Sequence, residues 1–117
     1  MLNIDLELKN KILFARLFGV FNNENIDYIK ENLFNIVSIN NINKVIINMS
    51  NLRDVDEYAL KFFIENKDII SFNNKLIICQ PKQRKIRRML KFIENNIYFI
   101  ENEDKAIELF ERMETYA

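Results

Sequence analysis

One segment, in which a buried strand runs through a polar turn into a helix, constrains the fold of this sequence most. Residues 45–49 are mainly β-branched or apolar, which is typical of a strand buried on both faces. A largely polar stretch, residues 51–56, follows, and apolar side chains then recur at helical spacing at Ala59, Phe62, Phe63 and Ile70. Ligands and partners often meet α/β sheets at such an edge, so this segment is the first candidate for a functional surface.

The rest of the chain predicts strands and helices that alternate after an initial hairpin. Residues 2–8 alternate between apolar and polar side chains, and residues 12–18 are apolar on both faces after a turn at Asn10. The only glycine, Gly19, is expected to close the second strand. Further strands are expected at 76–79 and 97–100, and helices at 22–39, 56–70, 81–93 and 103–113.

This order, β-β-α-β-α-β-α-β-α, predicts a single α/β domain over residues 1–117. Strands joined by helices pair in parallel, whereas the short first connection requires an antiparallel hairpin, so we expect a mixed, mostly parallel sheet. The core should contain most of a set of phenylalanines: Phe14, Phe18, Phe21, Phe62, Phe63 and Phe72. An exposed Phe18 or Phe21 would instead offer a surface for self-association.

The composition argues against several classes of function. The chain has 17 basic and 17 acidic residues, so its overall charge carries no nucleic-acid signature. It lacks histidine, the commonest general base and metal ligand, and one glycine is too few for a phosphate-binding loop. No Cys/His spacing suits a metal ion. We therefore expect no cofactor, no metal and no enzymatic activity.

An enzymatic alternative would have to use the carboxylates of Asp54, Asp56 and Glu57, or the thiol of Cys79. Each needs a neighbouring group that shifts its pKa, and no histidine is present to do so. Cys79 lies in an apolar run, where a core thiol is the simpler interpretation. The single cysteine, the absence of a signal-like apolar start and the absence of a membrane-length apolar run indicate a cytoplasmic protein.

Residues 56–60, Asp-Glu-Tyr-Ala-Leu, together with the order of the predicted elements, resemble the STAS domain of bacterial anti-sigma factor antagonists. In that family the central strand leads into a loop of the form Asp-Ser-Ser/Thr-Gly-Leu, which opens the second helix. Asp56 and Leu60 match this motif. The resemblance implies a domain that binds an anti-sigma factor or a related kinase-fold protein at this edge, and that releases it when the loop hydroxyl is phosphorylated.

Three positions in this segment differ from the family motif. Tyr58 occupies the position of the phosphorylated hydroxyl, Ala59 that of the glycine, and Glu57 that of the other hydroxyl residue. Tyrosine reaches too far from the backbone to replace serine, whereas Glu57 supplies a fixed charge near the place of the phosphate. We expect the partner-binding surface to consist of Asn51, Asp54, Asp56, Glu57 and Tyr58. The alternative is that Asp56 and Glu57 only cap the helix.

A basic run in the third predicted helix is a second candidate surface. Its side chains are Lys82, Arg84, Lys85, Arg87, Arg88 and Lys91. The run could steer an acidic partner or meet anionic lipid headgroups, and the lack of interleaved aromatic residues argues against nucleic acid. The alternative is a solvated face whose charge is offset by Glu108, Glu111 and Glu114 in the last helix.

The sequence thus predicts a protein-interaction module of the anti-anti-sigma type in a bacterial partner-switching pathway that regulates transcription. Two alternatives stay open. A divergent STAS scaffold, either monomeric or a homodimer, would have lost the switch, and phosphate transfer to a serine such as Ser50 would argue against it. An accessory subunit of a membrane transport system would meet the membrane only indirectly, through the basic helix.

Overall fold

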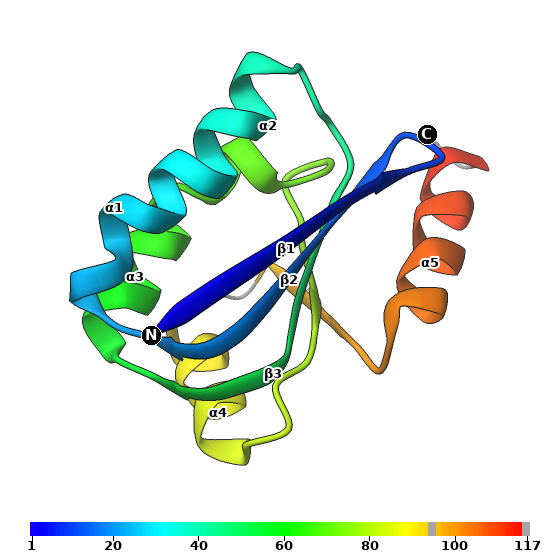
Figure 1. Cartoon of the computed structure of the whole chain (residues 1–117). Helices are drawn as coiled ribbons and strands as arrows, with labels where there is room; N and C mark the ends of the chain where they lie inside the picture. The colour runs from blue at the N-terminus through cyan, green and yellow to red at the C-terminus, as the bar shows by residue number, and fades with distance from the viewer. Residues whose placement is uncertain (94–95, 116–117) are drawn as a thin grey trace.

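The computed structural model describes residues 1–93 and 96–115 and arranges them as one sheet with helices on both faces (Figure 1). The sheet has five strands in the order β1-β2-β3-β4-β5. These are β1 (Leu2–Lys9), β2 (Ile12–Phe21), β3 (Val45–Val55), β4 (Leu76–Cys79) and β5 (Ile97–Ile100). β1 and β2 pair antiparallel and the other pairs are parallel, which confirms the predicted mixed sheet. β3 is its middle strand.

The helices follow the predicted order, with breaks that the sequence pattern does not reveal. The first helical region comprises a 3₁₀ turn η1 (Asn23–Asn25), α1 (Ile26–Ile29), a π-helical segment η2 (Lys30–Phe34) and α2 (Asn35–Ile39). The later helices are α3 (Glu57–Glu65), the 3₁₀ helix η3 (Lys67–Ile70), α4 (Arg84–Ile93) and α5 (Glu103–Thr115). The helix expected over 56–70 therefore breaks at Asn66, whose side-chain amide donates to the carbonyl of Phe62 (2.9 Å).

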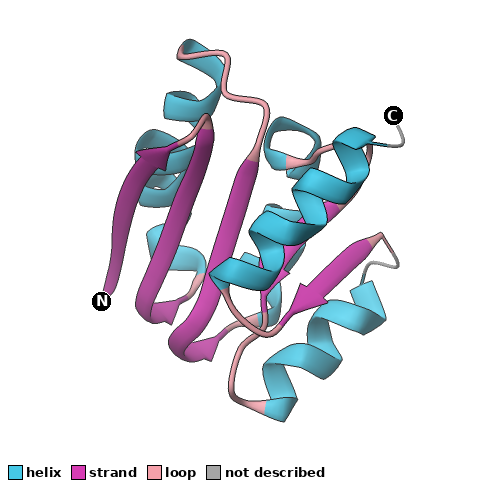
Figure 2. Cartoon of the chain, turned by 90° about the vertical axis from the view of Figure 1, so that its right-hand side faces the viewer, coloured by secondary structure: helices cyan, strands magenta, loops and turns pink. Residues whose placement is uncertain are grey.

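The two faces of the sheet support two separate clusters of buried side chains. β3 supplies both, because its successive residues point to opposite faces: Ile47 enters the larger cluster and Ile46 the smaller one. Helices α1 to α4 cover the larger cluster with side chains such as Leu33, Phe63 and Leu90. α5 covers the smaller one and lies across the sheet from them (Figures 1 and 2).

The prediction that Gly19 closes the second strand is wrong, because β2 continues through it to Phe21. Gly19 has φ +96°, and a Cβ atom there would lie 2.2 Å from the carbonyl oxygen of Met1. The N–H of the next residue, Val20, donates to that oxygen (3.1 Å). The glycine therefore allows β1 and β2 to approach closely while the strand changes its backbone conformation.

The polar stretch after residue 49 is also a strand, whereas the sequence suggests a turn. β3 extends to Val55, and its pairing with β2 contains two register shifts in which β3 advances by one residue more than β2. Such bulges interrupt the apolar alternation that identifies a strand, because the extra residue leaves the regular pattern. Asn51 and Asp54 consequently belong to β3 and not to a loop.

Asparagine occupies most of the described non-glycine positions with a left-handed backbone. The predicted turn at Asn10 is confirmed, with φ 54° there and 67° at Lys11, the pattern of a tight hairpin. Asn41, Asn73 and Asn74 have φ values of 52°, 50° and 64° in other connections. Asparagine tolerates this conformation better than most residues, which explains how a chain with a single glycine makes its turns.

Candidate functional site

Asp56 joins the end of β3 to the start of α3. Its N–H donates to the carbonyl of Phe21 (2.9 Å), which continues the sheet, and its side chain accepts from the N–H of Ala59 (3.0 Å). The backbone carbonyl of Asp56 accepts from the N–H of Leu60 (3.1 Å). The predicted N-cap is thus confirmed. Ala59 and Leu60 are fully buried, so the first turn of α3 is fixed against the sheet.

Asp54, Glu57 and Tyr58 near Asp56 face solvent, whereas Val55, directly before Asp56, is buried. Tyr58 is 74% exposed and Glu57 is exposed beside it, with its carboxylate 3.9 Å from the ammonium of Lys61. Asp54 is exposed at the end of β3 and lies 3.9 Å from Lys85 of α4. The sequence predicted Asp54, Asp56, Glu57 and Tyr58 as one surface, and all four lie at the junction of β3 with α3. Asn51 lies further back along β3, paired with Phe18.

The basic run lies on α4 and on the turn before it. Its exposed members are Lys82, Arg84, Lys85, Arg88 and Lys91. Arg87 differs, because its half-buried guanidinium donates to the carbonyl of Pro81 (3.0 Å) and stabilises the start of the helix. The basic surface therefore consists of four exposed cations on α4 and of Lys82 in the turn before it.

The expectation that acids of the last helix offset this run is wrong. α4 buries Ile86 and Leu90 in the larger cluster, whereas α5 packs on the smaller cluster at the opposite face of the sheet. Glu114 of α5 pairs with Lys44, and among the described residues Asp54 is the acid that pairs with the run, through Lys85. Helical periodicity alone cannot tell which face of the sheet a helix covers. The predicted inward position of Ile93 lies outside the described side chains.

A shallow groove of about 340 Å³ separates the start of α3 from α4. It is lined by Glu57 of α3 and by Arg88, Met89 and Phe92 of α4. Phe92 is 90% exposed, and the sequence-based prediction omitted it. A helical projection contains the missing signal, since Phe92 lies two residues after the buried Leu90 and so falls on the outward side of α4.

A polar network on the other face ties α5 to the sheet. Arg16 of β2 donates two hydrogen bonds of 2.8 Å to the carboxylate of Glu103, and a third, also 2.8 Å, to Glu7. Asn48 of β3 donates to the same Glu103 carboxylate (2.8 Å). These bonds hold the pKa of Glu103 below its usual value, with the guanidinium of Arg16 as the main cause. Sequence periodicity does not reveal this network, since its members are 87 residues apart.

Ser50 belongs to this second region and not to the start of α3. Its hydroxyl donates to the side chain of Asn48 (2.7 Å), and its surroundings include Glu101, Glu103 and Asp104. A phosphate at Ser50 would lie among carboxylates, where like charges repel it. Ser50 therefore lacks the environment of a phosphate acceptor.

Cys79 is 1% exposed in β4 and lies in the smaller cluster. Burial raises the pKa of its thiol to about 12, and the nearby charge of Glu103 acts in the same direction. A thiol in this state is a poor nucleophile, so the interpretation of Cys79 as a core residue is confirmed. Among the described residues, no group of three or more potential metal ligands occurs.

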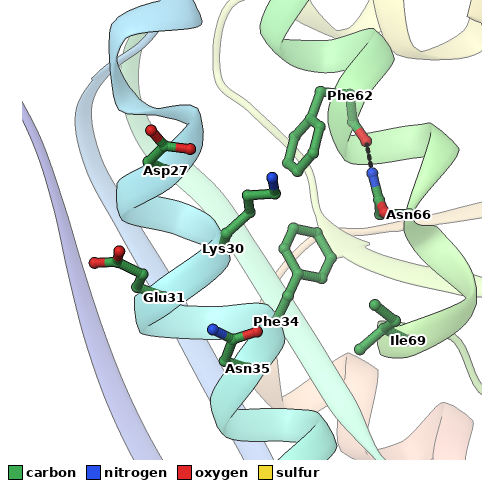
Figure 3. A pocket seen from close by; sticks show the side chains of 8 residues that line it. All are labelled: Asp27, Lys30, Glu31, Phe34, Asn35, Phe62, Asn66 and Ile69. Atoms are coloured by element: carbon green, nitrogen blue, oxygen red, sulfur yellow. Dashed lines mark hydrogen bonds between the residues drawn. The ribbon is translucent and has the colours of Figure 1, made fainter.

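A second groove, of about 400 Å³, lies between the first helical region and α3 (Figure 3). The ammonium of Lys30 lies 5.7 Å from the centre of the Phe62 ring, and Phe34 packs edge-on against the same ring. Asp27 and Glu31 place acids beside the lysine. With both charge signs around an apolar floor, this groove does not select a ligand class.

None of the helices in residues 1–93 and 96–115 has the length and apolarity needed to cross a membrane.

Comparisons with known proteins place this geometry in a family. Residues 3–106 match the STAS domain. The anti-sigma factor antagonist SpoIIAA in its unphosphorylated form shares 15% sequence identity with a TM-score of 0.69, covering 96% of this chain and 98% of that one. SpoIIAA from Bacillus in its phosphorylated form has 16% identity and a TM-score of 0.66, over 92% and 99% of the two chains.

A third solved structure, an anti-sigma factor antagonist from Mycobacterium paratuberculosis, has 11% identity and a TM-score of 0.74. It covers 93% of both chains. No curated protein sequence matches this chain significantly. The similarity to these solved structures shows the fold. The match to the STAS domain over residues 3–106 shows the family. The chain belongs to the STAS domain family.

Proposed function

We propose that this chain is an anti-sigma factor antagonist that acts in the bacterial cytoplasm by binding an anti-sigma factor or a related kinase-fold protein. It acts through association and not through catalysis. Membership of the STAS family supports this proposal, as does the likeness in fold to proteins described as anti-sigma factor antagonists.

The observation that carries the proposal is the exposure of Tyr58 at the start of α3. Tyr58 is 74% exposed, so a partner that covers its ring removes apolar surface from water and stabilises the complex. Tyrosine is also enriched among the residues that contribute most to binding free energy at interfaces. Its backbone is held in place, because Asp56 caps the helix and the two residues that follow Tyr58, Ala59 and Leu60, are buried. The ring is therefore presented from a fixed support, which reduces the entropy lost on binding.

The proposed association does not depend on phosphorylation. Glu57 contributes a permanent negative charge at the first turn of α3, where the helix dipole favours it. Glu57 and Tyr58 fill the two hydroxyl positions of the family motif, so a Ser/Thr kinase has no acceptor there. The partner must accommodate the carboxylate in its bound state.

Affinity capture tests the proposal. The full chain is immobilised and exposed to the native cytosol, and bound proteins are identified by mass spectrometry. The variants Tyr58→Ala and Glu57→Lys should retain the melting temperature and reduce capture of a kinase-fold partner at least tenfold. Tyr98→Ala, which alters a 40% exposed tyrosine in β5, is the matched control and should leave capture unchanged. Equal capture by all four proteins would remove the start of α3 from the function.

Incubation of the chain with the captured partner and ATP tests the absence of a switch. We expect no phosphate on the chain, as measured by intact-mass analysis. Phosphorylation of Ser50 or Tyr58 that releases the partner would contradict binding without a phosphate switch.

A further inference from the structure

Phe92 lies on the outer surface of α4 next to the proposed binding site. It is the most exposed large apolar side chain in the described part of the chain, at 90%. Burial of a phenylalanine side chain against a partner stabilises a complex. Single exposed apolar residues are common, so the significance of Phe92 depends on its neighbours.

The neighbours of Phe92 form a groove that connects it to the proposed site. Arg88 and Met89 lie one turn earlier on α4, at helical spacings that place them beside the ring. Glu57, from the first turn of α3, closes the other side. The groove, of about 340 Å³, thus joins an apolar floor on α4 to the residue next to Tyr58, and it has room for an apolar side chain.

The charges around this groove differ on its two sides. The α4 side carries the exposed cations Arg84, Lys85, Arg88 and Lys91. The opposite side carries Asp54, at the end of β3 near Lys85, and Glu57 of α3, which pairs with Lys61. The outer surface of α4 is therefore net positive, and a partner complementary to it must bring carboxylates around an apolar side chain.

We propose, resting on the proposed function, that α4 forms a second half of the interface and binds an acidic amphipathic segment of the partner protein. An apolar side chain of that segment fills the groove over Met89 and Phe92. Its carboxylates face Arg84, Arg88 and Lys91. α3 and α4 then act together, with Tyr58 and Phe92 as two aromatic anchors on one continuous surface.

An anionic membrane fits this surface less well than a protein does. Glu57 lines the groove and Asp54 lies beside Lys85, so lipid phosphates would approach carboxylates as closely as cations. Ile86 and Leu90 of α4 are buried against the sheet. Among the described side chains of α4, Phe92 and the half-buried Met89 are the apolar ones that stay accessible, whereas helices that bind bilayers present a wide apolar face.

A titration observed by NMR tests the proposal on the intact, ¹⁵N-labelled chain. The probe is a synthetic peptide with leucines at helical spacing and glutamate at the remaining positions. We expect shift changes in residues 84–92 and at Glu57, with affinity reduced at least tenfold by Phe92→Ser and by Arg88→Glu. Tyr98→Ser is the matched control. Because Phe92 is exposed, Phe92→Ser should leave the melting temperature unchanged.

Three results would overturn the proposal. The first is the absence of shift changes in α4, and the second is an equal response to a peptide with lysine in place of glutamate. The third is that the chain binds phosphatidylglycerol vesicles and not the acidic peptide, and that Phe92→Ser abolishes the binding to vesicles. If Tyr58→Ala abolishes capture of the partner while Phe92→Ser changes neither capture nor the peptide shifts, the proposed function stands and this inference fails.

Discussion

At the scale of single residues, the candidate surface depends on one carboxylate that is itself committed to structure. Asp56 makes three backbone-related hydrogen bonds, to Phe21, Ala59 and Leu60. Its carboxylate is thus engaged in capping, and the exposed residues beside it are the better candidates for direct contact. The sequence alone predicts the cap, because an acid before an amphipathic pattern has few other local explanations.

Replacement of Asp56 should separate capping from contact. Asp56→Ala removes the acceptor for the first turn of α3 and should lower the free energy of unfolding by about 1 kcal/mol. Asp56→Asn retains an acceptor oxygen and should cost less. Urea denaturation measures both values. Equal stabilities for wild type and Asp56→Ala would show that the cap contributes nothing.

Gly19→Ala should destabilise the protein strongly for a residue outside the core clusters. The left-handed backbone costs an alanine about 1–3 kcal/mol, and the new Cβ would lie 2.2 Å from the carbonyl oxygen of Met1. Thermal unfolding measures the loss. Asn3→Ala, at an exposed position of β1, is the control and should change stability little. A wild-type melting temperature for Gly19→Ala would contradict the close approach of β1 and β2.

Cys79 should be unreactive while the protein is folded. Because burial raises its pKa to about 12, almost no thiolate exists at pH 8. A disulfide reagent such as dithionitrobenzoate should therefore react with the native chain far more slowly than with the urea-unfolded chain. Similar rates in both states would mean that β4 exposes its end.

At the scale of elements, the position of α5 depends on the network around Glu103. Glu103→Gln should lower the free energy of unfolding at pH 7 by about 1–2 kcal/mol, since it weakens hydrogen bonds to a charged group. The pKa of Glu103 is lowered in the folded state. Its contribution is therefore present above the unfolded pKa, about 4.3, and is lost as pH falls through the folded value.

The lowered pKa of Glu103 makes the stability of the folded protein depend on pH. The stability difference between wild type and Glu103→Gln should be constant from pH 7 to about pH 5 and shrink below about pH 4, as urea denaturation at each pH would measure. Asp104→Asn, a change at the neighbouring acid in the same first turn of α5, is the control. A difference that is independent of pH down to acid denaturation would mean that the Arg16 pair is not formed.

Patterns within elements were predictable where burial is regular. The alternation of residues 2–8 and the spacing of Ala106 and Phe110 identified β1 and α5, because one face of each packs, wholly or in part, against a buried cluster. The end of β3 was not predictable, since its bulges remove the alternation that marks a strand. Of the candidate site, the sequence found the residues around Asp56 through their motif. It missed Phe92, because the exposed surface of α4 was described by its basic residues alone.

At the scale of the whole molecule, the arrangement of helices decides which residues can act together. The strand order and mixed sheet follow from the order of elements, which the sequence provides. The division of helices between the two faces follows from three-dimensional packing, which a one-dimensional pattern lacks. α3 and α4 cover the same face of the sheet, so the acidic residues at the start of α3 and the basic surface of α4 are neighbours. The acids of α5 lie on the opposite face.

The proposed function requires the chain to bind a partner protein through the start of α3. The most direct test is calorimetric titration of the purified, captured partner with wild type, Tyr58→Ala and the control Tyr98→Ala. We expect Tyr58→Ala to raise the dissociation constant at least tenfold, which is about 1.4 kcal/mol of binding free energy, while Tyr98→Ala matches the wild type. Equal affinities for all three proteins would contradict it.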